Sequence, residues 1–405
     1  MIDTICLLIP KDKMTFIEGV SNWELYSKTE QYSKFVRNPK KTEKDTGKYF
    51  PRLTGYRRQY SQDANVRIEL SLPKLLYLNN LDELEDKDFD EVIETLQERL
   101  KEMGVIISKK DTINASVSSV HYSKNILLKD GYTCNYLISE MNKVNLRKTF
   151  DFARSRYIND GQSLYAHTTS HQLVIYDKIL DLKKGEKKAI DKEQTLYQRS
   201  LFEIIDDDKK ELQEIIRFEV RLSHKVKMNK VFEELGYNKN PLFKDVFSSE
   251  ISKKVVNNYW QKLIKERNLG VFTISMTSKD IIQALYLSDS KMKPKQIIYL
   301  LGLYQLARDD NGLRELRTII SKRANDRTWY RIAKDIQEAG DIISKNKTRS
   351  WVKQIDEAID EYKAMKVKNL KLKEVKVKQN DMETWIEENS KEHTERLNKI
   401  INNKK

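Results

Sequence analysis

The stretch EIIRFEVRLSH, residues 214–224, alternates charged and apolar side chains, and this period of two predicts a β-strand with two different faces. The charged residues fall on one face and the apolar residues on the other: Arg217, Glu219 and Arg221 against Phe218, Val220 and Leu222. Because an unpaired carboxylate is costly to bury, Glu219 needs a cationic partner or a metal ion. The strand therefore predicts a sheet with one apolar face and one charged face.

A second strand of the same kind occurs in NVRIELSLPKLLY, residues 65–77, where Arg67 and Glu69 face away from Ile68 and Leu70. Apolar residues then recur at i, i+3, i+4 and i+7, which predicts a helix over 89–103. Gly104 is expected to end that helix. The segment NASVSSVHYSK returns to the strand period, so residues 66–123 are predicted to form a β-α-β unit.

The rest of the chain divides into strands, then helices, then a basic tail. A helix is predicted over 133–154, two strands joined by a turn over 163–178, and a charged helix over 188–203. The predicted fold class is α+β, with an antiparallel-rich central sheet and flanking helices followed by an all-α C-terminal region. The predicted domains are a sheet domain at 1–240, a helical domain at 241–345 that could include a helix-turn-helix, and a Lys-rich tail at 346–405.

The charge balance points to a polyanionic partner. The chain has 405 residues, with 75 Lys and Arg against 61 Asp and Glu, for a formal net charge of +14. Nucleic acid is the simplest such partner, because cations that neutralise phosphates release condensed counterions. A highly charged protein from an AT-rich genome, where lysine codons are abundant, is the alternative interpretation. The lysines of 363–378 are likewise either a solvated extension or an arm that contacts DNA.

The sequence also argues against several classes of protein. Cys6 and Cys134 are the only cysteines, too few for a disulfide framework or a zinc cluster, so we expect a reducing cytoplasm. No apolar run approaches the ~20 residues that span a bilayer, and the opening MIDTICLLIPKDK does not resemble a signal peptide. Without GxxxxGK followed by Ser or Thr, and without GxGxxG, no ATP-binding loop is expected.

Three ionisable residues on predicted strands are candidate metal ligands: Glu69, His121 and Glu219. Two carboxylates and an imidazole suit Mg²⁺ or Mn²⁺. The alternative is that both carboxylates form salt bridges, since Arg67 lies near Glu69 and two arginines flank Glu219.

Tyr176 ends an apolar strand, and Lys178 follows it two residues later. A phenol, with an ordinary pKa of about 10, becomes a nucleophile only when nearby positive charge or a metal stabilises its anion. The alternative is an ordinary packing tyrosine. The basic and aromatic loop 48–60 is a candidate DNA contact that could stack bases and hold phosphates, or else a partly buried loop, through Tyr49, Phe50, Tyr56, Arg57, Arg58 and Tyr60.

Four blocks in their order and spacing carry a family resemblance: VRIELSLPKLLYLNN, NASVSSVHYSKN, HQLVIYDKILDL and IIRFEVRLSHKVK with the LGYNKNPLFKDVF that follows. The series resembles the gene II/X family of phage and plasmid replication proteins, which initiate rolling-circle replication. The resemblance runs from MIDTICLLIP to DRTWYRIAKDIQEAG, about 340 residues.

The resemblance implies a tyrosine endonuclease related to the HUH and Rep nucleases, with its site on a central antiparallel sheet. It places the nucleophile at Tyr176, with Lys178 beside it. It also places the two R-x-E strands at Arg67 with Glu69 and at Arg217 with Glu219, and a metal ligand at or beside His121. One departure is that VHYSK offers a single histidine where the HUH group has two, so carboxylates would have to replace the second.

The implied reaction is a metal-dependent nick that leaves a 5′-phosphotyrosine and a 3′-OH primer, followed by strand transfer. The implied partners are single-stranded or supercoiled origin DNA, a host helicase and a host DNA polymerase in the bacterial cytoplasm, and no membrane. Arg67 and Arg221 would offset charge on the phosphate or the phenolate. Tyr122, Tyr157 and Tyr165 are possible second tyrosines that the sequence does not rank.

Three rival interpretations stay open at this point. The chain could be a non-catalytic DNA-binding protein of the same fold, a metal-dependent nuclease in which water attacks, or a structural phage protein.

Overall fold

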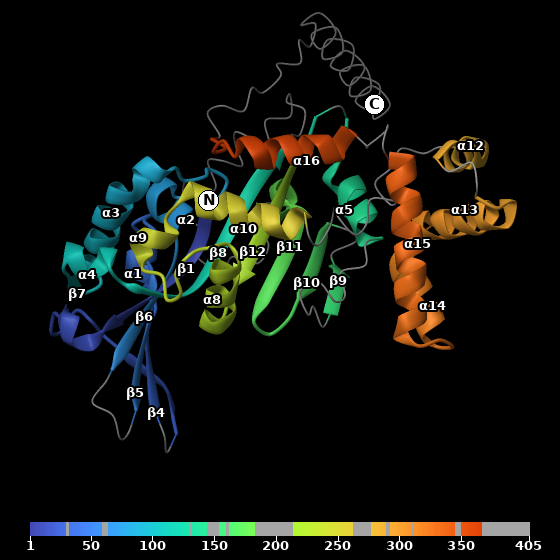
Figure 1. Cartoon of the computed structure of the whole chain (residues 1–405). Coiled ribbons are helices and arrows are strands. Elements are labelled where there is room, and N and C mark those ends of the chain that lie inside the picture. The colour runs from blue at the N-terminus through green and yellow to red at the C-terminus, as the bar shows by residue number, and fades with distance from the viewer. Residues whose placement is uncertain are drawn as a thin grey trace, which may run out of the picture.

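A computed structural model describes most of the chain, shown in Figure 1. The described residues are 1–29, 32–58, 64–129, 131–143, 154–158, 162–182, 214–261, 277–288, 292–309, 312–344 and 350–366. For residues 58, 154–158, 344 and 350 the description covers the backbone alone.

A ten-stranded antiparallel sheet forms the centre of the molecule, in the order β3-β4-β5-β6-β1-β8-β12-β11-β10-β9. A two-stranded sheet pairs β2 with β7. The strands are β1 (Ile2–Pro10), β2 (Met14–Phe16), β3 (Glu24–Lys28), β4 (Tyr32–Arg37), β5 (Arg52–Arg58), β6 (Asn65–Ser71), β7 (Val105–Ile107), β8 (Ser116–Leu127), β9 (Arg154–Ile158), β10 (Ser163–His167), β11 (His171–Asp177) and β12 (Ile215–Leu222).

The helices are α1 (Lys41–Lys44), α2 (Leu72–Tyr77), α3 (Phe89–Glu102), α4 (Lys109–Ile113), α5 (Cys134–Asn142), α8 (Lys225–Glu234), α9 (Phe243–Val246), α10 (Ser249–Tyr259), α12 (Ser278–Ser288), α13 (Pro294–Arg308), α14 (Gly312–Ser321), α15 (Asp326–Ser344) and α16 (Ser350–Glu361). Single 3₁₀ turns occupy Lys11–Lys13 and Asp86–Asp88. The coarse class of the fold is therefore α+β, as the sequence predicts.

The two faces of the sheet differ in what covers them. Apolar side chains such as Ile5, Ile68, Val220 and Ile175 form one large core with residues of α2, α3, α5, α8, α10 and α16. On β12 this core face takes Phe218, and the alternate residues point the other way. The polar face is closed at one end by a small apolar cluster: Leu81, Ile179, Leu182 and Ile215.

Most of the predicted elements form at the expected places. The helix predicted over 89–103 is α3, and Gly104 follows it with φ +81°. The two strands predicted over 163–178 are β10 and β11, which pair across the expected turn. Of the helix predicted over 133–154, α5 forms Cys134–Asn142 and Arg154 belongs to β9, while residues 144–153 lie outside the described residues. The helix predicted over 188–203 lies outside the described residues.

Side-chain packing divides the chain differently from the domains expected from its sequence. Helices α9, α10 and α16 contribute to the core of the sheet, although all three follow the boundary at residue 240. Helices α12, α13 and α15 share a separate cluster that includes Ile281, Leu300 and Ala339. Figure 1 shows α12 to α15 beyond the β9 end of the sheet.

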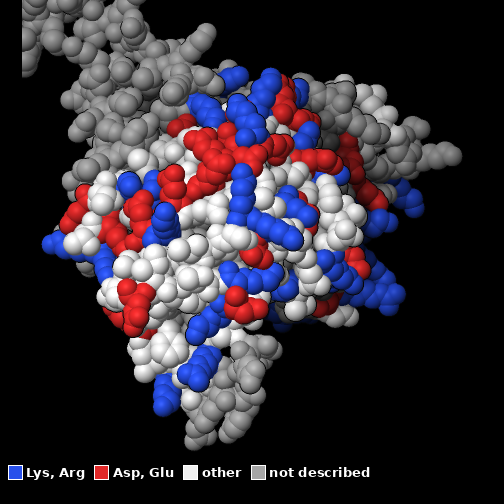
Figure 2. All heavy atoms as spheres, turned by 90° about the vertical axis from the view of Figure 1, so that its left-hand side faces the viewer, with Lys and Arg blue, Asp and Glu red and all other residues white. Residues whose placement is uncertain are grey.

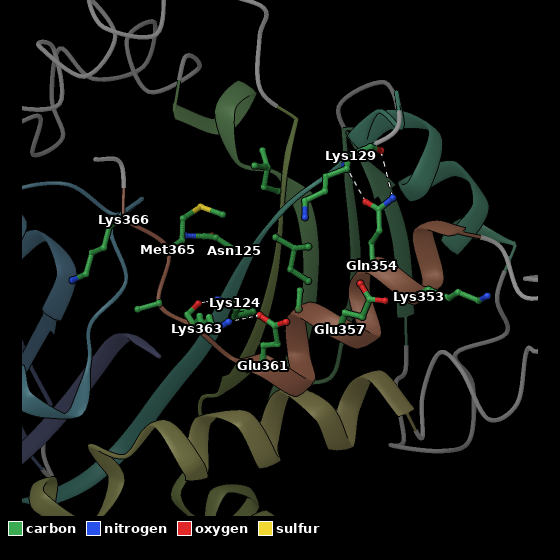
Figure 3. A pocket seen from close by; sticks show the side chains of 14 residues that line it. Lys124, Asn125, Lys129, Lys353, Gln354, Glu357, Glu361, Lys363, Met365 and Lys366 are labelled. Carbon is green, nitrogen blue, oxygen red and sulfur yellow. Dashed lines mark hydrogen bonds and ion pairs between the residues drawn. The ribbon is translucent and has the colours of Figure 1, made fainter. Parts of the chain in front are cut away.

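A short segment after α16, residues 362–366, crosses back to the N-terminal part of the chain, and we call it the C-terminal strap. The Lys124 ammonium donates to the carbonyl of Lys363 at 2.5 Å and to Glu83 at 2.7 Å. The backbone of Met365 both donates to Glu83 Oε2 (3.0 Å) and accepts from Glu83 N (2.9 Å). The strap, α16 and the end of β8 line an open pocket of about 500 Å³. Figure 3 shows the side chains that line it.

Candidate active site

Strand pairing brings most of the predicted site residues onto one face of the sheet. Tyr176 on β11 lies opposite Arg217 on β12. On the other side of β12, Arg221 lies opposite His121 of β8, two residues from Glu219. Because directly paired residues share a face, the polar face carries a phenol, an imidazole, a carboxylate and two guanidinium groups within three adjacent strands.

Glu219 is the centre of this group. Its Oε2 accepts a hydrogen bond from the Tyr176 hydroxyl at 3.2 Å, and Arg221 donates to both of its oxygens at 2.8 and 3.2 Å. His121 Nδ1 lies 3.7 Å from Glu219 Oε1. Burial would raise the pKa of Glu219, but Arg221 outweighs burial and holds that pKa below its ordinary value. Glu219 is therefore an ionised carboxylate in contact with the phenol.

Tyr176 is nearly buried, with 9 % of its surface exposed. Burial raises the pKa of its hydroxyl well above the ordinary value, while Arg217 opposes that rise. The free phenol is therefore protonated at neutral pH. Deprotonation requires an acceptor, and the hydrogen bond to Glu219 supplies one.

Arg217 is buried and held by three partners. It donates to Asp3 Oδ1 at 2.7 Å, to Ser123 Oγ at 2.7 Å and to the carbonyl of Asn80 at 2.8 Å. Burial would raise the pKa of Asp3, but Arg217 lowers it well below the ordinary value. Sequence patterns gave no signal for Asp3, which stands in an apolar strand that contributes no recognisable motif.

Lys178 lies just after β11 and is fully buried beside Tyr176. Its ammonium is 5.6 Å from the centre of the Tyr176 ring and 3.4 Å from Asp181 Oδ2. Burial, reinforced by Arg217, lowers the pKa of Lys178 to about 8. Lys178 is thus a cation that can give up its proton near neutral pH.

Glu69 does not join Glu219 and His121 as a ligand set. It pairs with Arg67 at 3.2 Å, and Arg67 also donates to Cys6 Sγ at 2.9 Å. Glu69 lies opposite Cys6, so β1 separates it from β8. Both Arg67 and Glu69 are partly exposed, at 37 % and 45 % of their side chains. For Glu69 the salt-bridge alternative describes the structure better than the metal-ligand hypothesis.

The chain matches no protein-family model, no curated protein and no solved structure.

His121 and Glu219 offer one nitrogen and one oxygen donor to a metal ion. Burial lowers the pKa of His121, so its imidazole is neutral at pH 7, the form that binds metals. A magnesium site commonly has only one or two protein carboxylates and completes its coordination with water and substrate phosphate. These two residues fit such a site in part, without Glu69.

A different group, Cys134, Asp177 and Glu214, could also hold a metal ion. Among the described residues it is the one set of three whose ligand atoms lie within 4.8 Å of one another. Burial raises the pKa of both the Cys134 thiol and the Asp177 carboxyl. Asp177 alternates with Tyr176 along β11, so it points to the opposite face, where α5 packs. This group is separate from the phenol, and spacing along the sequence did not reveal it.

The basic and aromatic loop is only partly available to a ligand. Tyr49 and Phe50 are buried in the core, and Tyr49 accepts a hydrogen bond from Ser71 N at 2.8 Å, so their predicted role in base stacking is wrong. Tyr56 is 37 % exposed and Arg57 is exposed on β5. The side chain of Arg58 and all of Tyr60 lie outside the described residues.

The structure also ranks the three possible second tyrosines. Tyr122 is fully buried on the core face and donates to the carbonyl of Val246 at 3.1 Å. Tyr157, described by its backbone alone, lies opposite Leu164, a core residue. Tyr165 lies opposite Val174 on the polar face, next to Glu219 and Arg221. Tyr165 is therefore the second phenol that lies closest to the candidate site.

None of the described helices combines the length and the apolar character that crossing a bilayer requires.

Proposed function

We propose that this chain is a DNA nickase and strand transferase that initiates rolling-circle replication, with Tyr176 as its nucleophile. The observation that carries the proposal is the hydrogen bond from the Tyr176 hydroxyl to the ionised Glu219, within a group that also holds Arg217, Arg221 and Lys178. A nucleophile, a proton acceptor and cations for a phosphate are the parts that a phosphoryl transfer to tyrosine needs.

The bonds exchanged in the proposed reaction balance. The Tyr176 oxygen attacks the scissile phosphorus, and its proton passes to Glu219. The bond between phosphorus and the 3′ oxygen breaks, and that oxygen takes a proton from Lys178, whose pKa of about 8 suits a general acid. The products are a 5′-phosphotyrosine, which conserves the phosphodiester bond energy, and a free 3′-OH that primes synthesis.

The arginines supply the electrostatic part of the catalysis. Arg217 opposes the effect of burial on the pKa of Tyr176, so it stabilises the phenolate as the proton leaves. Arg221 lies at the more exposed side of Glu219, with 29 % of its side chain accessible, where it can contact a phosphate oxygen. Charge-assisted hydrogen bonds of this kind favour the transition state more than the free substrate.

We further propose Mg²⁺ or Mn²⁺ as the cofactor, held by His121 and Glu219 together with the substrate phosphate. When bound, the ion polarises the scissile phosphate. Arg67 and Glu69 instead form an ion pair, at 3.2 Å, on strand β6.

The proposed substrate is single-stranded DNA, or origin DNA extruded from a supercoil. The width of a base-paired duplex would keep its phosphates from reaching the nearly buried phenol of Tyr176. Exposed Tyr56 on β5 lies opposite Asn65 and extends the polar face in the direction such a strand would take, whereas exposed Arg57 points to the other face. Because the sequence has no ATPase motif, unwinding falls to a host helicase and synthesis to a host polymerase, in the cytoplasm of a bacterial host.

The test compares wild type with Tyr176→Phe on supercoiled origin plasmid and on labelled single-stranded oligonucleotides, with Mn²⁺ or Mg²⁺. Wild type should nick and become covalently attached to the 5′ end, and Tyr176→Phe should do neither. Tyr165→Phe is the matched control, since it removes a hydroxyl from the same face and should retain at least about a tenth of the nicking rate.

Each rival interpretation makes a different prediction in the same assay. A nick with no protein-bound end would indicate attack by water, and binding without nicking would indicate a non-catalytic DNA-binding protein. Normal nicking by Tyr176→Phe would rule out Tyr176 as the nucleophile.

A further inference from the structure

Helices α14 and α15 form a compact pair joined by a tight turn. Helix α14 ends at Ser321 and α15 begins at Asp326, so four residues connect them. The Asn325 side chain accepts a hydrogen bond from Thr328 N at 3.1 Å, which caps the start of α15. The Arg317 guanidinium of α14 lies 5.9 Å from the centre of the Trp329 ring of α15, and Trp329 is buried. The start of α15 is therefore held in one position against α14.

The opposite side of this start is exposed and basic. Arg327, Tyr330, Arg331 and Lys334 recur at i, i+3, i+4 and i+7 and form one stripe on α15, and all are exposed. The core residues Trp329, Ile336 and Ala339 occupy the other side of the helix. Lys322 and Arg323 in the turn add two further exposed cations next to the stripe.

These cations are not used to stabilise the fold. Lys334 pairs with Glu338 at 3.4 Å, but within the part of the chain that the structure describes, Lys322, Arg323, Arg327 and Arg331 form no ion pair. The one acidic residue between 322 and 334 is Asp326, in the first turn of α15. The surface therefore has a net positive charge, and four of its five cations have no acidic partner among the described residues.

The other end of the molecule offers a contrast. Figure 2 faces the end that carries α3 and shows acidic side chains gathered on its upper half. The exposed acidic residues of α3 and of the loop before it are Asp86, Asp90, Glu91, Glu94 and Glu98, with Glu102 at the end of the helix. That surface repels phosphates, so the positive charge of α15 is a local feature and not a property of every helix in a basic protein.

We propose that the basic stripe of α15, with the turn before it, binds duplex DNA. The stripe from Arg327 to Lys334 extends about 10 Å along the helix axis, which matches the ~12 Å width of a major groove. A helix that follows a tight turn and presents its first turns outward is the arrangement by which helix-turn-helix proteins enter that groove. The helix N-terminus adds partial positive charge toward the phosphates.

This inference deepens the proposed function by giving it two separate DNA surfaces. The polar face of the sheet takes the single strand that is cut, and α15 holds the neighbouring duplex. Figure 1 shows α15 beyond the end of the sheet, away from β11 and β12, so a change on α15 leaves the Tyr176 group intact.

The experiment measures binding of two fluorescent probes by anisotropy: a mixed-sequence duplex of about 25 base pairs, and one of its strands alone. The test variant is Arg327→Ala with Arg331→Ala, which keeps α15 a good helix because alanine has the highest helix propensity. The matched control is Lys101→Ala with Lys110→Ala, which removes two exposed cations from α3 and α4. Circular dichroism and thermal unfolding establish that both variants are folded.

The expected result is a ~10-fold loss of duplex affinity for the α15 variant at moderate salt. The slope of log K against log salt should fall by about 2, as two lost phosphate contacts require. Single-strand affinity and nicking of a single-stranded oligonucleotide should change by less than about twofold. A duplex loss no larger than that of the control, or an equal loss for the single strand, would overturn the proposal.

The same assay separates this inference from the nickase proposal. Tyr176→Phe should bind the duplex as wild type does, and the α15 variant should still form the covalent adduct on a single strand. If Tyr176→Phe nicks as wild type does while Arg327→Ala with Arg331→Ala still loses duplex affinity, the inference stands and the nickase proposal falls.

Discussion

Tyr176 depends on its neighbours for any reactivity, because burial makes its phenol a weaker acid than a free tyrosine. In the proposed reaction Glu219 accepts the proton of this phenol and Arg217 stabilises the phenolate. Glu69, by contrast, is paired with Arg67 across a part of the sheet that the phenol does not reach. The two R-x-E strands look alike in sequence but are expected to differ in function.

This difference can be measured with one pair of variants. Glu219→Gln should lower the nicking rate at least ~100-fold, because it removes the proton acceptor while keeping the shape of the side chain. Glu69→Gln should lower it less than about tenfold, since it weakens a partly exposed ion pair. Single-turnover nicking with each variant tests the prediction, and equal losses would contradict it.

The burial of Lys178 makes the free energy of unfolding depend on pH, and its lowered pKa sets the direction of that dependence. Its pKa is about 8 in the folded protein and 10.5 when unperturbed, so the unfolded chain binds more protons between these values. Stability should therefore rise as pH increases from 8 to 10.5, and the burial penalty should be largest below pH 8.

The comparison that isolates this effect is wild type against Lys178→Met. The free energy of unfolding of wild type should increase by up to about 3 kcal/mol more than that of the variant over this interval. Urea unfolding at pH 7.5 and pH 10 provides the measurement. Parallel pH dependence in the two proteins would show that Lys178 is not the group responsible.

The strands were easier to predict from the sequence than the site they form. The alternation in β6 and β12 is strict because one face of each is core, so both strands and the side chains on their polar face follow from local pattern. β11 instead has consecutive buried apolar residues, and β8 has a register shift against β1. Which strands become neighbours depends on the whole topology. The meeting of Tyr176 with Glu219 was expected from a family resemblance, whereas the roles of Asp3 and Asn80 required the pairing of β1, β8 and β12.

Some other predictions from the sequence pattern differ from the structure for clear physical reasons. Tyr49 and Phe50 lie among charged residues, so their sequence surroundings suggest an exposed loop, but both pack into the core with Pro51 also buried, and exposure begins only at Lys48 and Arg52. At the end of the helix predicted over 133–154, Arg154 belongs to β9, because it pairs with His167 of β10. Long-range pairing overrides local helix preference at that residue.

The turn after α3 offers a test of how much a tightly packed turn contributes to stability, and the turn after α8 provides a matched control. Gly104 has φ +81° and a Cβ there would lie 2.7 Å from Ser21 N, while Gly236 has φ +82° and open space around it. Gly236→Ala should cost about 1 kcal/mol from backbone strain alone. Gly104→Ala should cost about 3 kcal/mol or more, because strain and a backbone clash add.

Chemical denaturation of the two glycine variants gives the comparison directly. Equal losses of stability would mean that the contact between the α3 turn and residues 20–21 relaxes without cost.

At the scale of the molecule, the C-terminal strap decides how a truncation should be designed. Stopping the chain after Lys366 removes the lysines that follow but keeps the contacts of Lys363 and Met365 with Lys124 and Glu83. That truncation should weaken DNA binding and flatten its salt dependence without a change in melting temperature, if those lysines contact phosphates.

Stopping after Glu361 should also lower the melting temperature by several degrees, because buried Lys124 and Glu83 each lose a hydrogen-bond partner. Melting curves of the two truncated proteins are the measurement. Identical curves would show that the strap contributes nothing to stability, even though it lies against the end of β8, as Figure 3 shows.

The strap also has a consequence for the order in which the protein is made. Strands β1 and β8 are synthesised early, but the core beneath them is completed by Trp351, Val352, Ile355 and Ile359 of α16, near the end of the chain. Contacts between such distant segments slow folding, because a long loop must close before they form. A ribosome must therefore release the chain through α16 before the sheet that carries Tyr176 and Glu219 is fully supported.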